Sequence, residues 1–218
     1  MSDPPTASNP GDQPLPEKHG RLEWYLPADL SPDARRLYDA ITGGPRTSSG
    51  GIWMSADGTG RLEGPFNAML ACPSVGSSLQ ELGASIRYRT SLTDRERELA
   101  ILATAAAEDC EFERVAHERH ARTYGLTDDE IRAVQSSGST GSLPPDEVIV
   151  LEVVRALTEH RDLSDHLFER AYRELGETKL VELIFLVGYY QTLALSLAAL
   201  RVPLPRHLGS FDGGTHPE

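Results

Sequence analysis

The amino-acid sequence predicts an all-α fold, a bundle of helices around one core. No stretch sustains the alternation of apolar and polar residues that marks a half-buried strand, and no Asn-Gly or Asp-Gly hairpin joins β-branched runs. Two pairs, Thr93 with Glu96 and Thr127 with Glu130, have the spacing of a capping box. These pairs predict helix N-termini at residues 93 and 127.

The composition limits the classes of function. With 39% hydrophobic and 25% charged residues, the 218-residue chain is typical of a globular protein with one main domain. A formal net charge of -12 opposes a phosphate-binding surface, because Lys and Arg supply nucleic-acid affinity. We therefore expect no nucleic-acid partner.

The cellular compartment follows from the N-terminus and the cysteines. Residues 1–5 have neither a basic start nor an apolar region of a secretory signal. Cys72 and Cys110 are the only cysteines, which is no disulfide framework, so we expect a cytoplasmic protein. The apolar segment 180–200 contains Glu182 and Gln191, so we expect it in a bundle core or a subunit interface and not in a membrane.

The first elements follow a proline-rich tail. Residues 1–20 hold few large apolar side chains and are expected to be disordered, and the domain is expected to span residues 21–205. Ser31 followed by Pro32 predicts the start of a helix that ends at Gly43. The Gly- and Ser-rich segment 43–64 contains Trp53, which either covers a pocket or a subunit or merely anchors the loop.

The remaining elements are helices separated by breaker residues. Their predicted ranges are 63–70 up to Pro73, then about 77–88, 94–107, from 108 or 109 to Gly125, 127–134, 145–160, Ser164 to Gly176, and Thr178 to just before Pro203. A flexible connector is expected at 136–142, and a flexible C-terminal tail at 206–218.

One run, residues 108–117, concentrates a thiol, several carboxylates and an imidazole. On a helix, Cys110, Glu113 and His117 share one face because they are three and four residues apart. Glu98 lies on the preceding predicted helix and reaches the same place if the two helices form a hairpin. A surface pair of Glu113 and His117 would show the same spacing, so spacing alone leaves a structural role open.

An ordered series of motifs resembles the carboxymuconolactone decarboxylase-like family, which includes alkylhydroperoxidase D-like proteins. The resemblance covers residues 21–205 and implies an all-helical bundle, homo-oligomers and no organic cofactor. It is carried by Glu63-Gly64-Pro65-Phe66-Asn67, Leu92-Thr93-Asp94-Arg95, Glu98-Leu99-Ala100-Ile101-Leu102, Glu113 with His117, Gly125-Leu126-Thr127, and Val181-Glu182-Leu183 through Gly188-Tyr189-Tyr190.

The chain departs from the peroxidase branch of that family at one position. In that branch a Cys-x-x-Cys pair works beside a glutamate and a histidine, which would correspond to Glu98 and His117. Cys110 matches the first cysteine, but Glu113 stands where the second should be. Without it the small disulfide of the thiol cycle cannot form. The resemblance then leaves Glu98, Glu113 and His117 as an acid/base set.

These residues support three hypotheses. The first is a cofactor-independent acid/base enzyme, a decarboxylase, lactone-modifying enzyme or isomerase, in which His117 transfers a proton with help from Glu113 and Glu98. The second is a thiol-dependent antioxidant enzyme that uses Cys110, although nearby carboxylates oppose a thiolate. The third is a non-catalytic helical oligomer that binds a ligand or partner.

The first hypothesis also names contacts for a small carboxylated or carbonyl substrate. Arg87, Arg89 and Arg95 each suit a carboxylate or are surface charges. Four further side chains are candidate apolar walls or core residues: Phe66, Met69, Trp53 and Tyr190. A metal site made by Glu98, Glu113, His117 and His120 is not expected. His117 and His120 are three residues apart, not four as in His-Glu-x-x-His.

Overall fold

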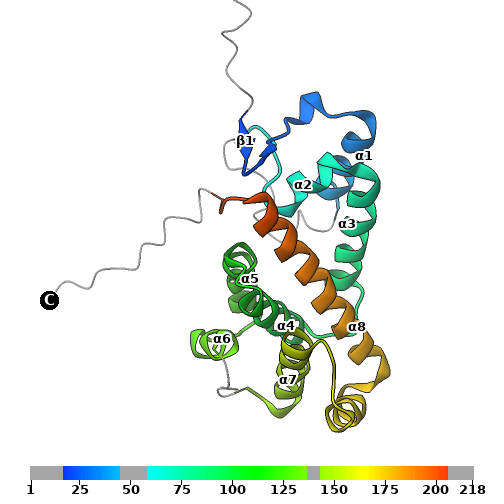
Figure 1. The fold of residues 1–218 in the computed structure, drawn as a ribbon, viewed down its shortest axis with the longest axis vertical. Helices are drawn as coiled ribbons and strands as arrows, with labels where there is room; N and C mark the ends of the chain where they lie inside the picture. Colours follow the sequence, from blue (N-terminus) through cyan, green and yellow to red (C-terminus); the bar gives the residue numbers. More distant parts are fainter. Residues whose placement is uncertain (1–16, 45–57, 137–142, 206–218) are drawn as a thin grey trace, which may run out of the picture.

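The computed structural model describes residues 17–44, 58–136 and 143–205 (Figure 1). Helices make up 73% of this part of the chain, which confirms the predicted all-α class. The elements are β1 (Lys18–His19), β2 (Leu22–Glu23), η1 (Pro27–Asp29), α1 (Pro32–Thr42), α2 (Pro65–Ala71), α3 (Pro73–Tyr88), α4 (Asp94–Ala107), α5 (Glu111–Thr123), α6 (Asp128–Gln135), α7 (Pro145–His160) and α8 (Asp165–Leu200).

The predicted helix starts are confirmed where a capping side chain marks them. Both capping boxes form. The Thr93 and Thr127 side chains accept from the backbone N–H three residues later, and the Glu96 and Glu130 carboxylates accept from the backbone N–H of the two threonines. Ser31 accepts from the N–H of Ala34, with Pro32 at the first helical position of α1. Local polar chemistry therefore fixes the N-termini of α1, α4 and α6.

The structure differs from the sequence prediction at several element boundaries. The antiparallel pair β1–β2 was not predicted, and Lys18 and His19 fold against the domain although they fall in the predicted tail 1–20. Residues 1–16 of that tail lie outside the described residues, as do Trp53, residues 137–142 of the predicted connector and the tail 206–218. Helix α3 begins at Pro73, because proline suits a first helical position as well as it stops a helix.

Helix α4 lies at the centre of the bundle, in contact with α5, α7 and α8 (Figure 1). Its residues from Glu96 to Ala105 are all buried, so the helix is enclosed on every side. Glu98 is one of the few charged residues within this stretch and has no solvent exposure. A carboxylate in such a place must be paired, and the pairing defines the candidate site.

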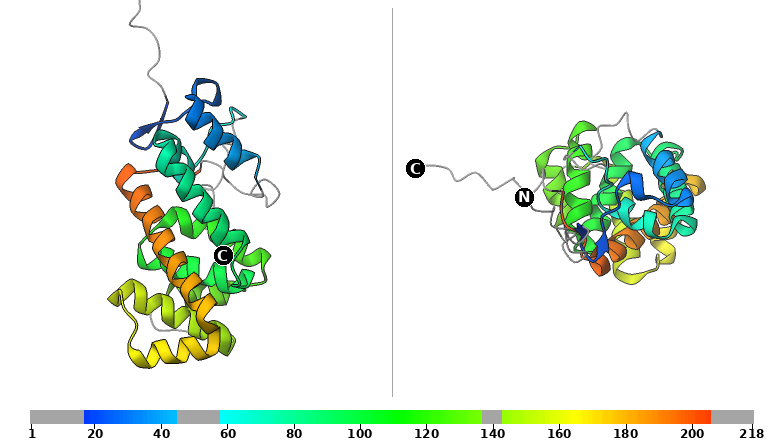
Figure 2. Two further views of the ribbon diagram at one scale, coloured as in Figure 1. Left: turned by 90° about the vertical axis from the view of Figure 1, so that its right-hand side faces the viewer. Right: turned by 90° about the horizontal axis from the view of Figure 1, so that it is seen from above.

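Helix α8 runs along the molecule beside α3 and α4, as two views show (Figure 1, Figure 2). Its backbone leaves helical geometry at Gly176, where φ is 80° and ψ is 165°, which matches the predicted break. Among the described helices, α8 is the one long and apolar enough to span a membrane, a criterion that core helices of soluble proteins also meet. It packs here into the bundle.

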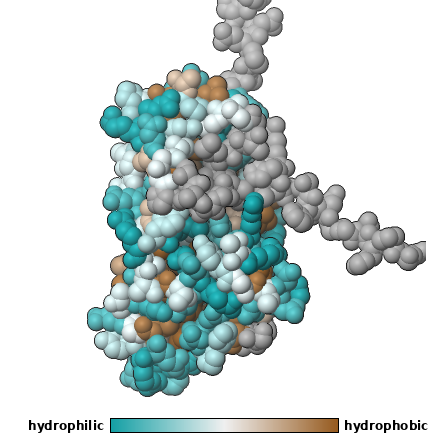
Figure 3. All heavy atoms as spheres, turned by 180° about the vertical axis from the view of Figure 1, so that it is seen from behind, coloured by the Kyte–Doolittle hydropathy of each residue, from teal (hydrophilic) through white to brown (hydrophobic). Residues whose placement is uncertain are grey.

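The outer side of α8 carries exposed apolar residues. Val181, Phe185 and Leu195 are 42%, 63% and 71% exposed, and Val75 on the neighbouring α3 is 64% exposed. The opposite face of the molecule is mostly hydrophilic, with separate apolar patches (Figure 3). Large apolar side chains are therefore exposed along α8.

Candidate functional site

The helical hairpin of α4 and α5 brings the predicted site residues together. A short turn joins the two helices, with Asp109 at a φ of 49° and the N–H of Cys110 bound to the Ala105 carbonyl at 2.8 Å. Helix α5 then runs back along α4. His117 on α5 thereby meets Glu98 on α4, as the sequence predicted.

The strongest contact of the site joins Glu98 and His117. The Oε2 atom of Glu98 lies 2.7 Å from Nδ1 of His117, and the two side chains are 0% and 2% exposed. Because Oε2 accepts from Nδ1–H, Glu98 fixes the orientation of the imidazole and leaves Nε2 for other contacts.

The pair is held in its charged form. Burial alone would raise the pKa of Glu98, but the charge and hydrogen bond of His117, together with Arg87, hold that pKa below its ordinary value. Burial alone would lower the pKa of His117, but Glu98 and Glu113 outweigh it and raise the pKa. Both pKa shifts favour the charged forms of the pair, an imidazolium beside a carboxylate.

Glu113 approaches the other nitrogen of the imidazole. It lies one helical turn before His117, and its Oε2 is 3.4 Å from Nε2. Both side chains line the same cavity, whereas Glu98 lies behind the imidazole. Glu98 therefore orients His117, and Glu113 stands on the cavity side.

Arg87 and Tyr190 complete the polar part of the site. Nη1 of Arg87, on α3, lies 3.7 Å from Oε1 of Glu98, and a side-chain hydrogen bond joins Arg87 to Tyr190. The Tyr190 ring, on α8, meets the His117 ring edge to face at 5.3 Å. Burial raises the pKa of Tyr190, so the residue stays a neutral phenol that can donate a hydrogen bond.

These side chains border a narrow cavity between α2, α3, α5 and α8. Its volume of about 20 Å³ is the room of one water molecule. Three predicted contacts, Phe66, Arg87 and Tyr190, line it together with Glu113 and His117. Four further lining residues were not predicted, because each reads in the sequence as an ordinary core residue: Pro65, Phe112, Tyr189 and Leu193.

The other predicted site residues lie elsewhere. Met69 is buried in the main core and does not border the cavity, so the prediction that it contacts substrate is not supported. Cys110 is the N-cap of α5 and packs with Phe112, Ala194 and Leu197. Burial raises the pKa of its thiol to about 11, so it is a poor thiolate.

His120 is a buried neighbour that the sequence named only as a metal ligand. Its ring lies 5.9 Å from that of His117 and its side chain is almost fully buried. Burial, together with Arg87 and His117, lowers its pKa to about 4, so it is neutral beside a charged partner. Over residues 17–44, 58–136 and 143–205, no three His, Cys, Asp or Glu side chains are placed to hold a metal ion.

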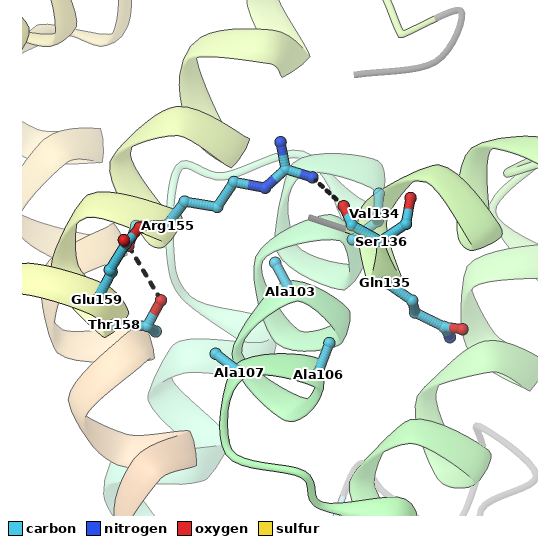
Figure 4. Close-up of a pocket in the computed structure, with 9 residues that line it drawn as sticks. All are labelled: Ala103, Ala106, Ala107, Val134, Gln135, Ser136, Arg155, Thr158 and Glu159. Carbon is cyan, nitrogen blue, oxygen red and sulfur yellow. Dashed lines mark hydrogen bonds between the residues drawn. The ribbon is translucent and has the colours of Figure 1, made fainter. Parts of the chain in front are cut away.

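A larger hollow of about 360 Å³ lies between α4, α6 and α7 (Figure 4). Three alanines of α4 face it, and Arg155 reaches across to donate to the Ser136 carbonyl at 2.8 Å. Its lining contains no histidine and no cysteine. Size alone would favour this hollow, but the acid/base groups gather at the small cavity.

The sequence of this chain was compared with protein-family models and with curated protein sequences. Residues 73–143 match the carboxymuconolactone decarboxylase family, and this range includes Arg87, Glu98, Glu113 and His117. No curated protein sequence matches the chain significantly. The matched range runs from α3 through α6, so it contains the whole α4–α5 hairpin.

Solved structures with similar folds come from three bacteria. A peroxidase-related protein with an alkylhydroperoxidase AhpD core from Ralstonia eutropha JMP134 aligns with a TM-score of 0.68 at 18% identity, over 88% of this chain and 95% of its own. A peroxidase-related protein from Silicibacter sp. TM1040 gives 0.70 at 10% identity, over 89% and 96%. A putative antioxidant defence protein AhpD from Agrobacterium tumefaciens gives 0.59 at 20% identity, over 64% and 96%.

Proposed function

We propose that this chain, whose residues 73–143 match the carboxymuconolactone decarboxylase family and whose fold resembles AhpD-like proteins, is a cofactor-independent acid/base enzyme. Its substrate is a small carboxylated or carbonyl compound, and the reaction is a decarboxylation, a lactone modification or an isomerisation. The observation that carries the proposal is the buried pair of Glu98 and His117, 2.7 Å apart, whose imidazole also borders a cavity beside Glu113.

His117 acts as the proton donor. Its raised pKa favours the protonated imidazole, and Glu98 holds Nδ1 so that Nε2 carries the transferable proton. Glu113 stands 3.4 Å from Nε2 and supplies a carboxylate that can take a proton from substrate or return one to the imidazole. One donor and one acceptor thus border the same small space.

Arg87 and Tyr190 stabilise the negative charge that such a reaction creates. When a carboxylate leaves as carbon dioxide or a carbon loses a proton, the electron pair remains on the substrate and spreads onto a neighbouring carbonyl oxygen. The Arg87 guanidinium and the Tyr190 hydroxyl are buried donors at the cavity wall and suit that oxygen. Carbon then accepts a proton from Nε2 of His117.

The cavity is closed to anything larger than water. A substrate therefore enters only when the aromatic wall moves, that is, Phe66 and Phe112, which line this space together with His117. Closure around the substrate would exclude water and strengthen each charge interaction inside. We expect binding to be accompanied by movement of this wall.

The thiol-dependent alternative rests on Cys110 alone. Burial raises the pKa of its thiol, and Glu113 occupies the position where the second cysteine would be needed. Cys72, the other cysteine, is exposed at the junction of α2 and α3. The acid/base proposal uses the residues that the fold buries together, and for that reason we prefer it.

We also propose that the enzyme is a cytoplasmic homo-oligomer. The exposed apolar side chains of α8 support it, since a second copy would cover Val181, Phe185 and Leu195. Tyr190 and Leu193 lie on the inner side of the same helix and border the cavity. Assembly through α8 would therefore stiffen one wall of the site.

Proton exchange in D₂O tests the catalytic proposal without a known reaction. Small keto acids, lactone carboxylates and unsaturated carboxylates are incubated with the protein, and deuterium incorporation at carbon is followed by NMR. We expect incorporation with the wild type and a loss of at least about 100-fold in His117→Gln. His160→Gln is the matched control, because that histidine is exposed at the end of α7.

Two results would contradict this proposal. Equal exchange rates in the wild type and His117→Gln would remove His117 as the proton donor. Absence of exchange with every compound class would remove the acid/base function itself. In both cases the circular dichroism spectrum must show that the variants are folded.

A further inference from the structure

The N-terminal hairpin of β1 and β2 lies against two parts of the fold that are distant in sequence. Its turn meets the end of α8, where the N–H of Arg21 donates to the Leu200 carbonyl at 2.8 Å (Figure 1). A Cβ at Gly20 would lie 2.4 Å from that carbonyl oxygen, so only glycine permits this approach. The hairpin is therefore fitted to the domain.

His19, on β1, is the buried residue of this hairpin. It is 2% exposed, and its ring stacks on Trp24 with centroids 5.0 Å apart. Its Nε2 accepts a hydrogen bond from the Gly64 N–H at 3.0 Å, which requires a neutral imidazole with the proton on Nδ1. Burial lowers the pKa of His19 to about 4, so this neutral form holds at physiological pH.

Gly64 connects that bond to the cavity. Its φ of 60° is left-handed, and a Cβ there would lie 2.4 Å from the Phe112 ring. The next two residues, Pro65 and Phe66, open α2 and line the cavity with Phe112. The backbone held by His19 is thus in contact with both sides of the aromatic wall.

A second contact fixes the same segment from its other end. Asn67 is 1% exposed, its Oδ1 accepts from the Tyr25 N–H at 3.1 Å and its Nδ2 donates to the Glu23 carbonyl at 2.9 Å. The start of α2 is therefore held at two positions by three hydrogen bonds to the N-terminal segment, one at Gly64 and two at Asn67.

We infer that His19 is a positioning residue for the cavity: its bond to the Gly64 N–H fixes Pro65 and Phe66 against Phe112 and so sets the wall that faces His117. This role rests on the proposed function, because it concerns the site that would bind substrate. His19 does not border the cavity and acts through the Gly64 backbone.

The hydrogen-bond donor to Nε2 of His19 is the Gly64 amide and not a neighbouring charged side chain. Oε2 of Glu63 lies 3.7 Å from the same nitrogen, beyond hydrogen-bond distance. The guanidinium of Arg61 lies 5.2 Å from the Trp24 ring and pairs with Glu17 at 2.6 Å. Protonation of Nε2 would remove the acceptor and direct a proton at the amide.

A matched pair of amide variants tests the inference. In His19→Gln the side-chain oxygen can take the place of Nε2, whereas in His19→Asn the shorter side chain cannot reach the Gly64 N–H. We expect hydrogen exchange at the Gly64 amide to be about tenfold faster in His19→Asn and little changed in His19→Gln. The pH midpoint of His117, followed by ¹⁵N imidazole NMR, should shift in His19→Asn only.

A merely structural role gives a different pattern. If His19→Asn accelerates exchange equally at Gly64 and at central α4 amides, with the His117 midpoint unchanged, the inference is overturned. If His19→Asn does not fold, a titration of the wild-type protein from pH 6 to 4 replaces the variant as the test. The Phe66 and Phe112 ring signals should then shift as His19 is protonated, and unchanged ring signals would overturn the inference.

These measurements use no turnover. A protein without acid/base activity would fail the exchange test in D₂O and could still show the coupling between His19 and the cavity wall. Failure of the coupling, with His117-dependent turnover intact, would remove His19 alone.

Discussion

Replacing Glu98 by Gln isolates the electrostatic pair at the centre of the site. The amide keeps the size of the side chain and an oxygen that can accept from Nδ1 of His117, but it removes the negative charge. His117 and Arg87, both buried, then lose the carboxylate that lies 2.7 Å and 3.7 Å away. We expect the pKa of His117 to fall, because burial then acts with less opposition.

The stability cost of this substitution follows from burial. Removing one partner of a buried ion pair typically costs about 3–5 kcal/mol, since the remaining charge stays desolvated. That is a large part of the stability of a domain, about 5–15 kcal/mol. Urea unfolding at pH 7, followed by circular dichroism, measures it. Glu111→Gln is the control, because Glu111 is 65% exposed on α5 and should cost less than about 0.5 kcal/mol.

The pH dependence of the effect has a defined sign. The raised pKa of His117 means that its stabilisation is complete below pH 6.5 and is lost as pH rises through the folded value. The lowered pKa of Glu98 means that its stabilisation is present above pH 4.5 and is lost as pH falls. An unchanged unfolding midpoint for Glu98→Gln near pH 6 would refute the charged pair.

Three further predictions concern other residues. Cys110, with a pKa of about 11, is about one part in ten thousand thiolate at pH 7. Iodoacetamide should therefore label the exposed Cys72 first, and mass spectrometry after mild peroxide should find Cys110 unoxidised. Rapid sulfenic acid formation on Cys110 would support the thiol hypothesis instead. The lowered pKa of His120 means that its contribution to stability is complete above pH 6.5 and falls as the pH drops toward 4, by at most about 1.4 kcal/mol per pH unit. In His120→Gln, the free energy of unfolding measured with urea should therefore depend less on pH between 6.5 and 4. Light scattering should show an oligomer that Phe185→Glu dissociates, and a wild-type monomer would contradict assembly through α8.

The fold could be predicted where a side chain and a nearby backbone group form a hydrogen bond that marks a helix end. Thr93, Thr127 and Ser31 mark helix starts because their side chains satisfy backbone N–H groups within three residues. The hairpin of β1 and β2 could not be found in this way. Its strands are two residues long, and it is held by contacts to Gly64 and Leu200, which are far away in sequence.

The candidate site was predictable in composition and less so in arrangement. Helical spacing placed Glu113 beside His117, and the hairpin of α4 and α5 brought Glu98 to them. The order of the two glutamates around the imidazole depends on how the helices pack, which spacing does not report. Phe112 shows a similar limit, since an apolar residue borders a cavity or fills a core according to tertiary packing alone.

The charge state of His117 is the most direct test of this account. In ¹⁵N-labelled protein at pH 7, the imidazole signals of His117 report whether one or both ring nitrogens carry a proton. The pair with Glu98 and the proximity of Glu113 predict two protonated nitrogens, with a deprotonation midpoint above pH 6.5. A neutral His117 at pH 7 would contradict the proposal that this residue is the proton donor of the site.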